Sequence, residues 1–284
     1  MAKKKGKGKK GKKGKGGEAK PAVITTPQMQ TERNRIAAEG EPLGHRFAVT
    51  VRGSALRQEV AGARLRKVIE AQQASLDLRG LALDAVPGAL AVEVTLDEWD
   101  VPLPPANNAV EKHDLLWKAL RAVDLSFNGL YKTADTFVAL GCLGGRLQEL
   151  SLKANALAGA VPAAAGKLTG LRKLNLDSNS FTSLSEEAAA GWAAVADFSA
   201  ARNAFVVLPD TTQAWGKLER LDLHANKLAV LDPDFTFGSW PLLSVANLTQ
   251  NQLSKLPPTV GACPALRALY VTNNKVGGLA CHHN

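Results

Sequence analysis

Residues 147–157 read LQELSLKANAL, and this stretch decides the fold of the chain. The same order returns 24 residues later as LRKLNLDSNSF, residues 171–181. In both stretches, apolar residues stand at the first, fourth, sixth and eleventh positions and an asparagine at the ninth. The fourth and sixth residues alternate with polar ones, so their side chains point to the same side of a short strand. One such strand cannot bury its apolar face alone, whereas stacked copies share a continuous core.

The pattern continues in phase over about 150 residues. Seven copies carry the asparagine, at Asn128, Asn155, Asn179, Asn203, Asn226, Asn251 and Asn274. The asparagine amide both donates and accepts hydrogen bonds, so it can satisfy backbone groups where each strand bends. Chance spacing of leucines would not hold the asparagine in phase as well.

Two degenerate copies precede these seven. The first has Leu76, Leu78, Leu83 and Val86 in frame, with Leu81 at the asparagine position. The second has Val94, Leu96 and Val101 in frame, with Trp99 at that position. Neither leucine nor tryptophan can make the hydrogen bonds of the asparagine.

This order resembles the signature of leucine-rich repeat proteins over roughly residues 73–280. The resemblance implies an α/β solenoid, with a curved, parallel concave sheet, short helices or turns on the convex side, and an internal ladder of asparagines. It also implies a non-enzymatic interaction module, similar to intracellular members that belong to axonemes or regulate phosphatases. The Lys/Gly-rich start is similar to that of some ciliary proteins.

We expect three segments: a disordered tail at residues 1–20, an N-terminal extension with a helical cap at residues 21–72, and a solenoid of about nine repeats at residues 73–284. Ser54 can cap the helix that would cover the first repeat. On this helix Val60, Val68 and Ile69 lie near one face, and Arg64 is expected elsewhere.

The positive charge is confined to the tail. Residues 1–20 hold ten lysines and one glutamate, and the other 264 residues hold 25 basic and 25 acidic residues. A basic nucleic-acid-binding fold is therefore not indicated. The tail is either a solubilising segment or a contact for an anionic surface such as nucleic acid, acidic lipid or the acidic tails of tubulin. The lysines expected to make that contact are Lys3, Lys4, Lys5, Lys9, Lys10, Lys12 and Lys13.

The remaining composition favours the cytoplasm, and the resemblance to axonemal and ciliary members implies the cytoskeleton, including a ciliary or flagellar axoneme. The three cysteines are not clustered in the flanks as in extracellular repeat proteins, which favours a reducing compartment. No segment approaches about 20 apolar residues, so no membrane span is expected. No apolar segment follows the basic start, so no secretory signal is expected.

Partner-binding residues are expected on the concave face, because solenoids commonly use that face. The side chain between the two strand apolar residues marks it: Asp77, Thr95, Asp124, Ser151, Asn175, Ser199, Asp222, Asn247 and Tyr270. Of these we select Asp124, Ser151, Asn175, Asp222, Asn247 and Tyr270, together with His224, as candidate contacts. The alternative is that this face is merely solvated.

No catalytic constellation, cofactor or metal is indicated. His224 lies near Asp222, but no nucleophile is placed beside it. Cys281, His282 and His283 are adjacent and lack the spacing of a zinc site. The last strand, near Leu269, leaves an open sheet edge, which we expect another chain to cover.

The sequence therefore predicts an interaction scaffold, a structural subunit of a cytoskeletal, microtubule-associated complex such as a ciliary axoneme. Two alternatives stay open. One is a nucleic-acid or ribosome-associated adaptor that binds through the tail. The other is a regulatory subunit of an enzyme such as a phosphatase.

Overall fold

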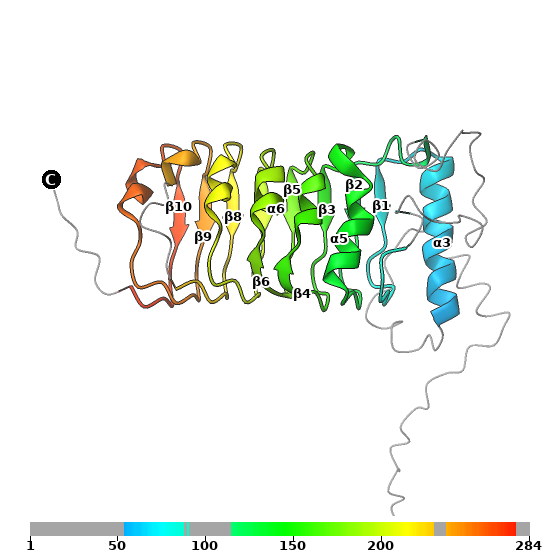
Figure 1. The fold of residues 1–284 in the computed structure, drawn as a ribbon, viewed down its shortest axis with the longest axis horizontal. Helices are drawn as coiled ribbons and strands as arrows, with labels where there is room; N and C mark the ends of the chain where they lie inside the picture. The colour runs from blue at the N-terminus through cyan, green and yellow to red at the C-terminus, as the bar shows by residue number, and fades with distance from the viewer. Residues whose placement is uncertain (1–53, 88–89, 91–114, 230–236, 277–284) are drawn as a thin grey trace, which may run out of the picture.

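The computed structural model describes residues 54–87, 90, 115–229 and 237–276. Their main feature is a sheet of eight parallel strands in a row along the long axis (Figure 1). In order these are β1 (Ser75–Asp77), β2 (Ala122–Asp124), β3 (Glu149–Ser151), β5 (Lys173–Asn175), β7 (Asp197–Ser199), β8 (Arg220–Asp222), β9 (Val245–Asn247) and β10 (Ala268–Tyr270). The predicted leucine-rich repeat solenoid is confirmed.

The strands stack with their apolar side chains in one column. Each strand pairs with the next so that the central residues face each other, as in Leu150 with Leu174 and Leu221 with Ala246. In the main sheet, the central residues of β1, β2, β3, β5, β7, β8 and β9 are buried, and Leu269 of β10 is half-buried. The near-constant repeat length holds this register, because a one-residue slip would turn the apolar set outward.

The seven asparagines connect neighbouring rungs. Asn203 donates from Nδ2 to the carbonyl of Leu176 in the preceding rung at 2.9 Å and to Ala200 in its own rung at 3.1 Å. Its Oδ1 accepts the backbone N–H of Phe181, also in the preceding rung, at 3.0 Å. The same three-way bonding occurs at Asn128, Asn155, Asn179, Asn226, Asn251 and Asn274. In the first rung Leu81 is fully buried instead, and Asn128 reaches back to bond Leu78 and Leu83.

A left-handed residue precedes each asparagine. Its φ lies between 54° and 57° in all seven copies, at Phe127, Ala154, Ser178, Arg202, Ala225, Gln250 and Asn273. A non-glycine residue in this conformation costs about 1 kcal/mol. The hydrogen bonds of the adjoining asparagine offset that cost and fix the bend.

The convex side carries short, stacked helical segments (Figure 1). These are α5 (Thr133–Gly141), α6 (Glu186–Gly191) and the 3-10 turns η3 (Gly144–Arg146), η4 (Ala163–Lys167), η5 (Asp210–Ala214), η6 (Phe237–Ser239) and η7 (Pro258–Ala262). Two further parallel strands, β4 (Ala158–Val161) and β6 (Ser180–Leu184), form a small second sheet. Ser185 caps α6 by accepting the N–H of Ala188 at 3.1 Å.

Three buried tryptophans link successive convex segments. The Nε1 atoms of Trp192, Trp215 and Trp240 donate to carbonyls one repeat earlier, at distances of 3.0, 2.7 and 2.8 Å. Because the indole N–H is satisfied, each ring can be buried without an unpaired donor.

Helix α3 (Ser54–Glu70) packs beside β1 at one end of the rod (Figure 1). Its residues Val60, Leu65 and Ile69 are buried in the common core. The expectation that Arg64 lies away from this face is wrong, because its side chain is only 5% exposed. Arg64 stays buried because its guanidinium donates to the carbonyl of Asp77 at 2.9 Å.

The second degenerate copy, with Val94, Leu96, Trp99 and Val101, lies outside the described residues. Strand β1 pairs directly with β2, so no strand from that stretch stands between them as the frame had predicted. The described sheet therefore has eight rungs rather than nine.

Replacing Asn251 by alanine should lower the free energy of unfolding by about 1–3 kcal/mol, because it leaves buried backbone groups without partners. Asn251 is 7% exposed and bonds Leu223, Leu248 and Leu228. The exposed neighbour Gln252 provides the control, and Gln252→Ala should have little effect. Urea unfolding followed by circular dichroism measures both, and equal losses would contradict the role of the ladder.

Replacing Gly170 by alanine should also destabilise the protein, because a Cβ there would lie 1.9 Å from the carbonyl oxygen of Gly145 in the preceding repeat. Gly216→Ala is the matched control, since no atom lies within 4 Å of a Cβ at that position. We expect the first variant to lose more than about 1 kcal/mol of stability and the second to lose none. Thermal unfolding of the two variants side by side tests this difference.

Candidate functional site

The candidate site is the face of the main sheet that lies opposite the apolar column, which we call the concave face. The structure places six of the predicted contacts at the last position of their strands: Asp124, Ser151, Asn175, Asp222, Asn247 and Tyr270. His224 follows two residues after Asp222. All are partly accessible, and Tyr270 is the most exposed, at 54%. The fold therefore brings these residues into one row across successive rungs.

Several of these side chains also serve the backbone, a role that the sequence reasoning missed. Asp124, Asn175, Asp222 and Asn247 each accept the backbone N–H two residues further on, at distances of 2.9, 2.9, 3.0 and 3.2 Å. Asp77 does the same in the first rung. The recurrence of Asp and Asn at this position therefore reflects local capping of the strand end as well as any partner contact.

A charged network lies at the N-terminal end of the face. Arg79 contacts Asp77 through two hydrogen bonds, of 3.0 and 2.8 Å, and lies 3.4 Å from the Asp124 carboxylate. Arg64 also lies 3.7 Å from the Asp77 carboxylate. Burial alone would raise the pKa of Asp77, but hydrogen bonds from Arg79 and the charges of both arginines outweigh burial and lower it. The same contacts with Asp77 raise the pKa of Arg79.

Other polar side chains pair across neighbouring rungs. Arg220 donates twice to Asp197 of the preceding rung, at 2.8 and 3.2 Å, whereas His224 lies 2.9 Å from Asp222 within one rung. The hydroxyls of Ser126 and Ser151 are 2.6 Å apart. Arg220 and Asp197 therefore compensate each other's charge within the sheet.

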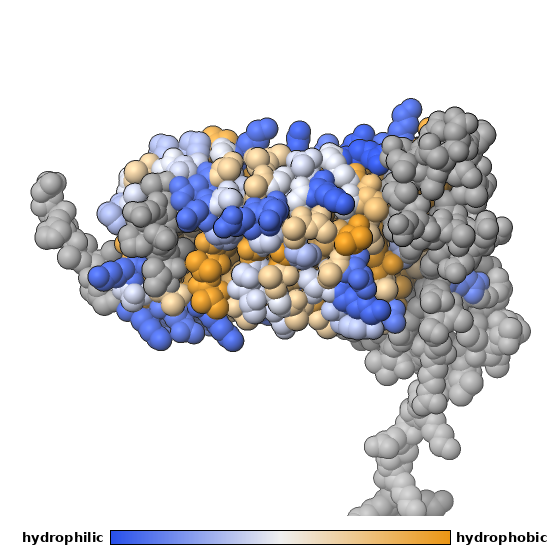
Figure 2. Space-filling view, in the orientation of Figure 1, coloured by the Kyte–Doolittle hydropathy of each residue, from blue (hydrophilic) through white to orange (hydrophobic). Residues whose placement is uncertain are grey.

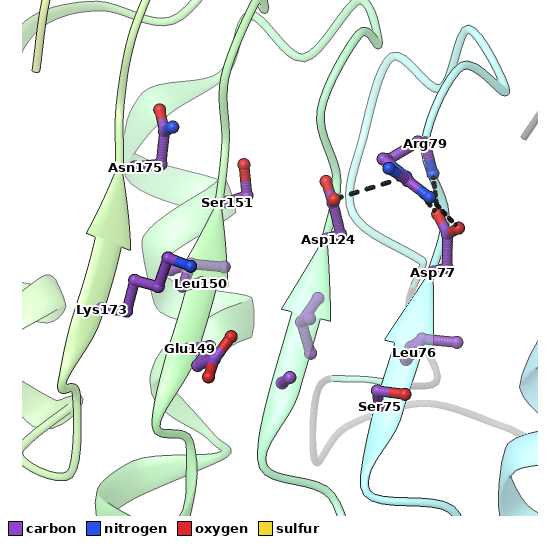
Figure 3. Close-up of a pocket in the computed structure, with 12 residues that line it drawn as sticks. Ser75, Leu76, Asp77, Arg79, Asp124, Glu149, Leu150, Ser151, Lys173 and Asn175 are labelled. Atoms are coloured by element: carbon purple, nitrogen blue, oxygen red, sulfur yellow. Dashed lines mark hydrogen bonds and ion pairs between the residues drawn. The ribbon is translucent and has the colours of Figure 1, made fainter. Parts of the chain in front are cut away.

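The strands β1, β2, β3 and β5 line an open hollow of about 470 Å³ (Figure 3). Its charged lining comprises Asp77, Arg79, Asp124, Glu149 and Lys173. Arg79, Glu149 and Lys173 were not among the predicted contacts. Glu149 and Lys173 each stand two residues before a selected residue on the same strand, so the alternation of the strands was a usable signal.

The described residues offer no obvious chemistry for a reaction. Among them, no three His, Cys, Asp or Glu side chains are grouped so that they could hold a metal ion. Cys142 and Cys263 are both free thiols, and burial raises the pKa of Cys263. Cys281, His282 and His283 lie outside the described residues, as do the seven tail lysines and Thr95.

Exposed large apolar side chains are dispersed in the described part of the chain. They are Leu115, Phe127, Tyr131, Val138, Val206, Val207, Leu242 and Tyr270. Figure 2 shows small apolar areas separated by polar ones on the face in view. In the described segments, no helix is long and apolar enough to cross a membrane. The expected uncovered end beyond β10 stays a prediction, because residues 277–284 are not described.

Comparison with known proteins agrees with this architecture. The family described as "Leucine rich repeat" matches residues 216–276. The chain is 33% identical over 128 residues to the probable inactive serine/threonine-protein kinase roco10 of Dictyostelium discoideum, covering 45% of this chain and 4% of that protein. It is 35% identical over 136 residues to podocan-like protein 1 of Mus musculus, covering 46% of this chain and 23% of that protein. The chain thus spans under a quarter of the length of both relatives.

A solved structure shows the same fold. The functional domain of InlJ from Listeria monocytogenes, which includes a cysteine ladder, aligns with a TM-score of 0.53 and 18% identity. The alignment covers 77% of this chain and 38% of that chain. Together with the repeats and the sheet, these matches make the chain a leucine-rich repeat protein. Proteins of this class generally mediate protein–protein interactions.

The charge network at Asp77 predicts a pH dependence of stability. Because the folded pKa of Asp77 lies below the unfolded value of about 3.9, its ionisation stabilises the fold above that pH. The stabilisation is lost as the pH falls through the folded pKa. Asp77→Asn should therefore be less stable than the original at neutral pH, and the two should converge once the pH has fallen below the folded pKa of Asp77.

Urea unfolding midpoints measured from neutral to acidic pH test this expectation. Asp84→Asn is the control, since Asp84 is exposed and takes no part in the network. A constant difference between Asp77→Asn and the original protein at every pH would contradict the electrostatic origin of the effect.

Proposed function

We propose that this protein is a non-enzymatic scaffold whose concave face binds a partner protein. The observation that carries the proposal is the row of accessible polar side chains on eight parallel rungs, ending in the exposed aromatic ring of Tyr270. Rigid rungs hold these side chains in fixed positions. Binding a partner therefore costs little conformational entropy on the scaffold's side of the interface. An exposed tyrosine is a frequent anchor in protein interfaces.

We further propose that the protein is a structural subunit of a cytoskeletal complex in the cytoplasm, with a ciliary axoneme as its setting. The support is the basic tail, whose ten lysines suit an acidic neighbour such as a tubulin tail. The tail and the concave face would then bind different surfaces of one assembly. The C-terminal end of the sheet is a third proposed contact.

A nucleic-acid or ribosome-associated adaptor is the second candidate, and the same tail favours it. Such binding would release counterions and fall steeply with salt. A regulatory subunit of an enzyme such as a phosphatase is the third candidate, in which the concave face holds the enzyme. Affinity purification of the full chain from its native source, at low and high salt, separates these candidates by the identity of what is retained.

Tyr270→Ala should weaken binding of the retained partner about tenfold, as expected for an interface anchor. Tyr131→Ala is a closely matched control, because the chain has two tyrosines and their exposures are 54% and 56%. Tyr131 follows Leu130 and is not part of the strand row. Surface plasmon resonance with the purified partner measures both, and equal effects of the two variants would exclude the concave face as the binding surface.

A further inference from the structure

Strands β3 and β5 carry opposite charges at the same position. Glu149 and Lys173 are register partners, both are exposed, and both line the hollow. Within the described residues, neither side chain makes a hydrogen bond or an ion pair. Figure 3 shows the carboxylate of Glu149 and the ammonium of Lys173 at different heights along the strands instead of meeting.

The other charges that line the hollow are already compensated. Arg79 contacts both Asp77 and Asp124. Glu149 and Lys173 are therefore the charges of the hollow that remain available to a ligand. An exposed pair between them would contribute only about 0–1 kcal/mol, so a ligand that replaced it would lose little.

We propose that the hollow binds a helix of the partner protein, with a basic side chain over Glu149 and an acidic side chain one helical turn away over Lys173. The inference rests on the proposed function and specifies the chemistry of the partner. Both contacts become stronger when the partner covers the hollow and excludes water, because the local dielectric falls. The hydroxyl of Ser151 and the amide of Asn175 lie on the same two strands and supply neutral polar contacts beside the charges.

The spacing of the rungs favours a helix lying across the strands. Neighbouring strands are about 4.8 Å apart, and one turn of an α-helix rises about 5.4 Å. Each turn therefore meets one rung with a mismatch of about 0.6 Å, which long side chains absorb. In an extended segment, side chains on one face recur about every 6.6 Å. They therefore fall out of register with the strands after two rungs.

Three synthetic helices test the proposal. Each is an alanine-rich peptide of about 20 residues, long enough to be helical, with two charged residues at positions i and i+4 on one face. The pairs are Lys/Glu, Lys/Lys and Glu/Glu. Fluorescence anisotropy measures the affinity of each peptide for the full chain and its variants. The tail is common to all variants, so the change in relative affinity reports on the hollow.

Glu149→Lys should shift the ratio of affinities by about tenfold from the Lys/Glu peptide toward the Glu/Glu peptide. Lys173→Glu should shift it by a similar factor toward the Lys/Lys peptide. Glu186→Lys makes the same charge change on helix α6 and should leave the order unchanged. Because the expected result is a switch of preference, loss of folding cannot imitate it.

If the ratios of peptide affinities are unchanged in Glu149→Lys and Lys173→Glu, the inference is overturned. If Tyr270→Ala still weakens the native partner in that case, the concave face stays the binding surface and only the assigned partner chemistry fails. If neither the native partner nor the peptides respond to any of these changes, the proposed function fails as well.

Discussion

The solenoid depends on one hydrogen-bonded element, the asparagine side chain that joins each rung to the one before it. At each bend the backbone leaves carbonyl and amide groups that the sheet does not pair, and the amide of a residue such as Asn203 bonds them in both rungs. Because these groups are buried, leaving them unpaired would cost about 1–3 kcal/mol for each. The asparagine also holds the left-handed residue before it. A local bend and the contact between repeats are thus stabilised by the same side chain.

The remaining packing follows from the close stacking that the ladder imposes. On the convex side, the backbones of Gly145 and Gly170 approach so closely that no side chain fits at the second position. Where the repeats leave more room, the indoles of Trp192, Trp215 and Trp240 fill it and bond the preceding repeat. The convex side therefore contributes large side chains to the core, and the concave face carries polar residues.

The polar side chains of the concave face have two structural roles. Residues such as Asp124 and Asn175 cap the end of their own strand, and they are still accessible from outside. Ion pairs between neighbouring rungs, such as Arg220 with Asp197, compensate charge within the sheet. What distinguishes the hollow is a pair of charges, Glu149 and Lys173. Within the described part of the chain, these side chains neither cap a strand end nor form an ion pair between rungs. This difference supports the proposal that the hollow binds a charged partner.

The sequence by itself determined the repeat, the inward column of apolar residues and the row that faces outward, because these follow from a period that any stacked strand must obey. It misplaced the stretch around Trp99, where local alternation resembles a rung but β1 pairs directly with β2. The burial of Arg64 and the compensation of Asp77 by Arg79 were decided by the tertiary structure. Such contacts join residues of different elements, and their distances depend on how the cap and the rungs pack, which no spacing along the chain records.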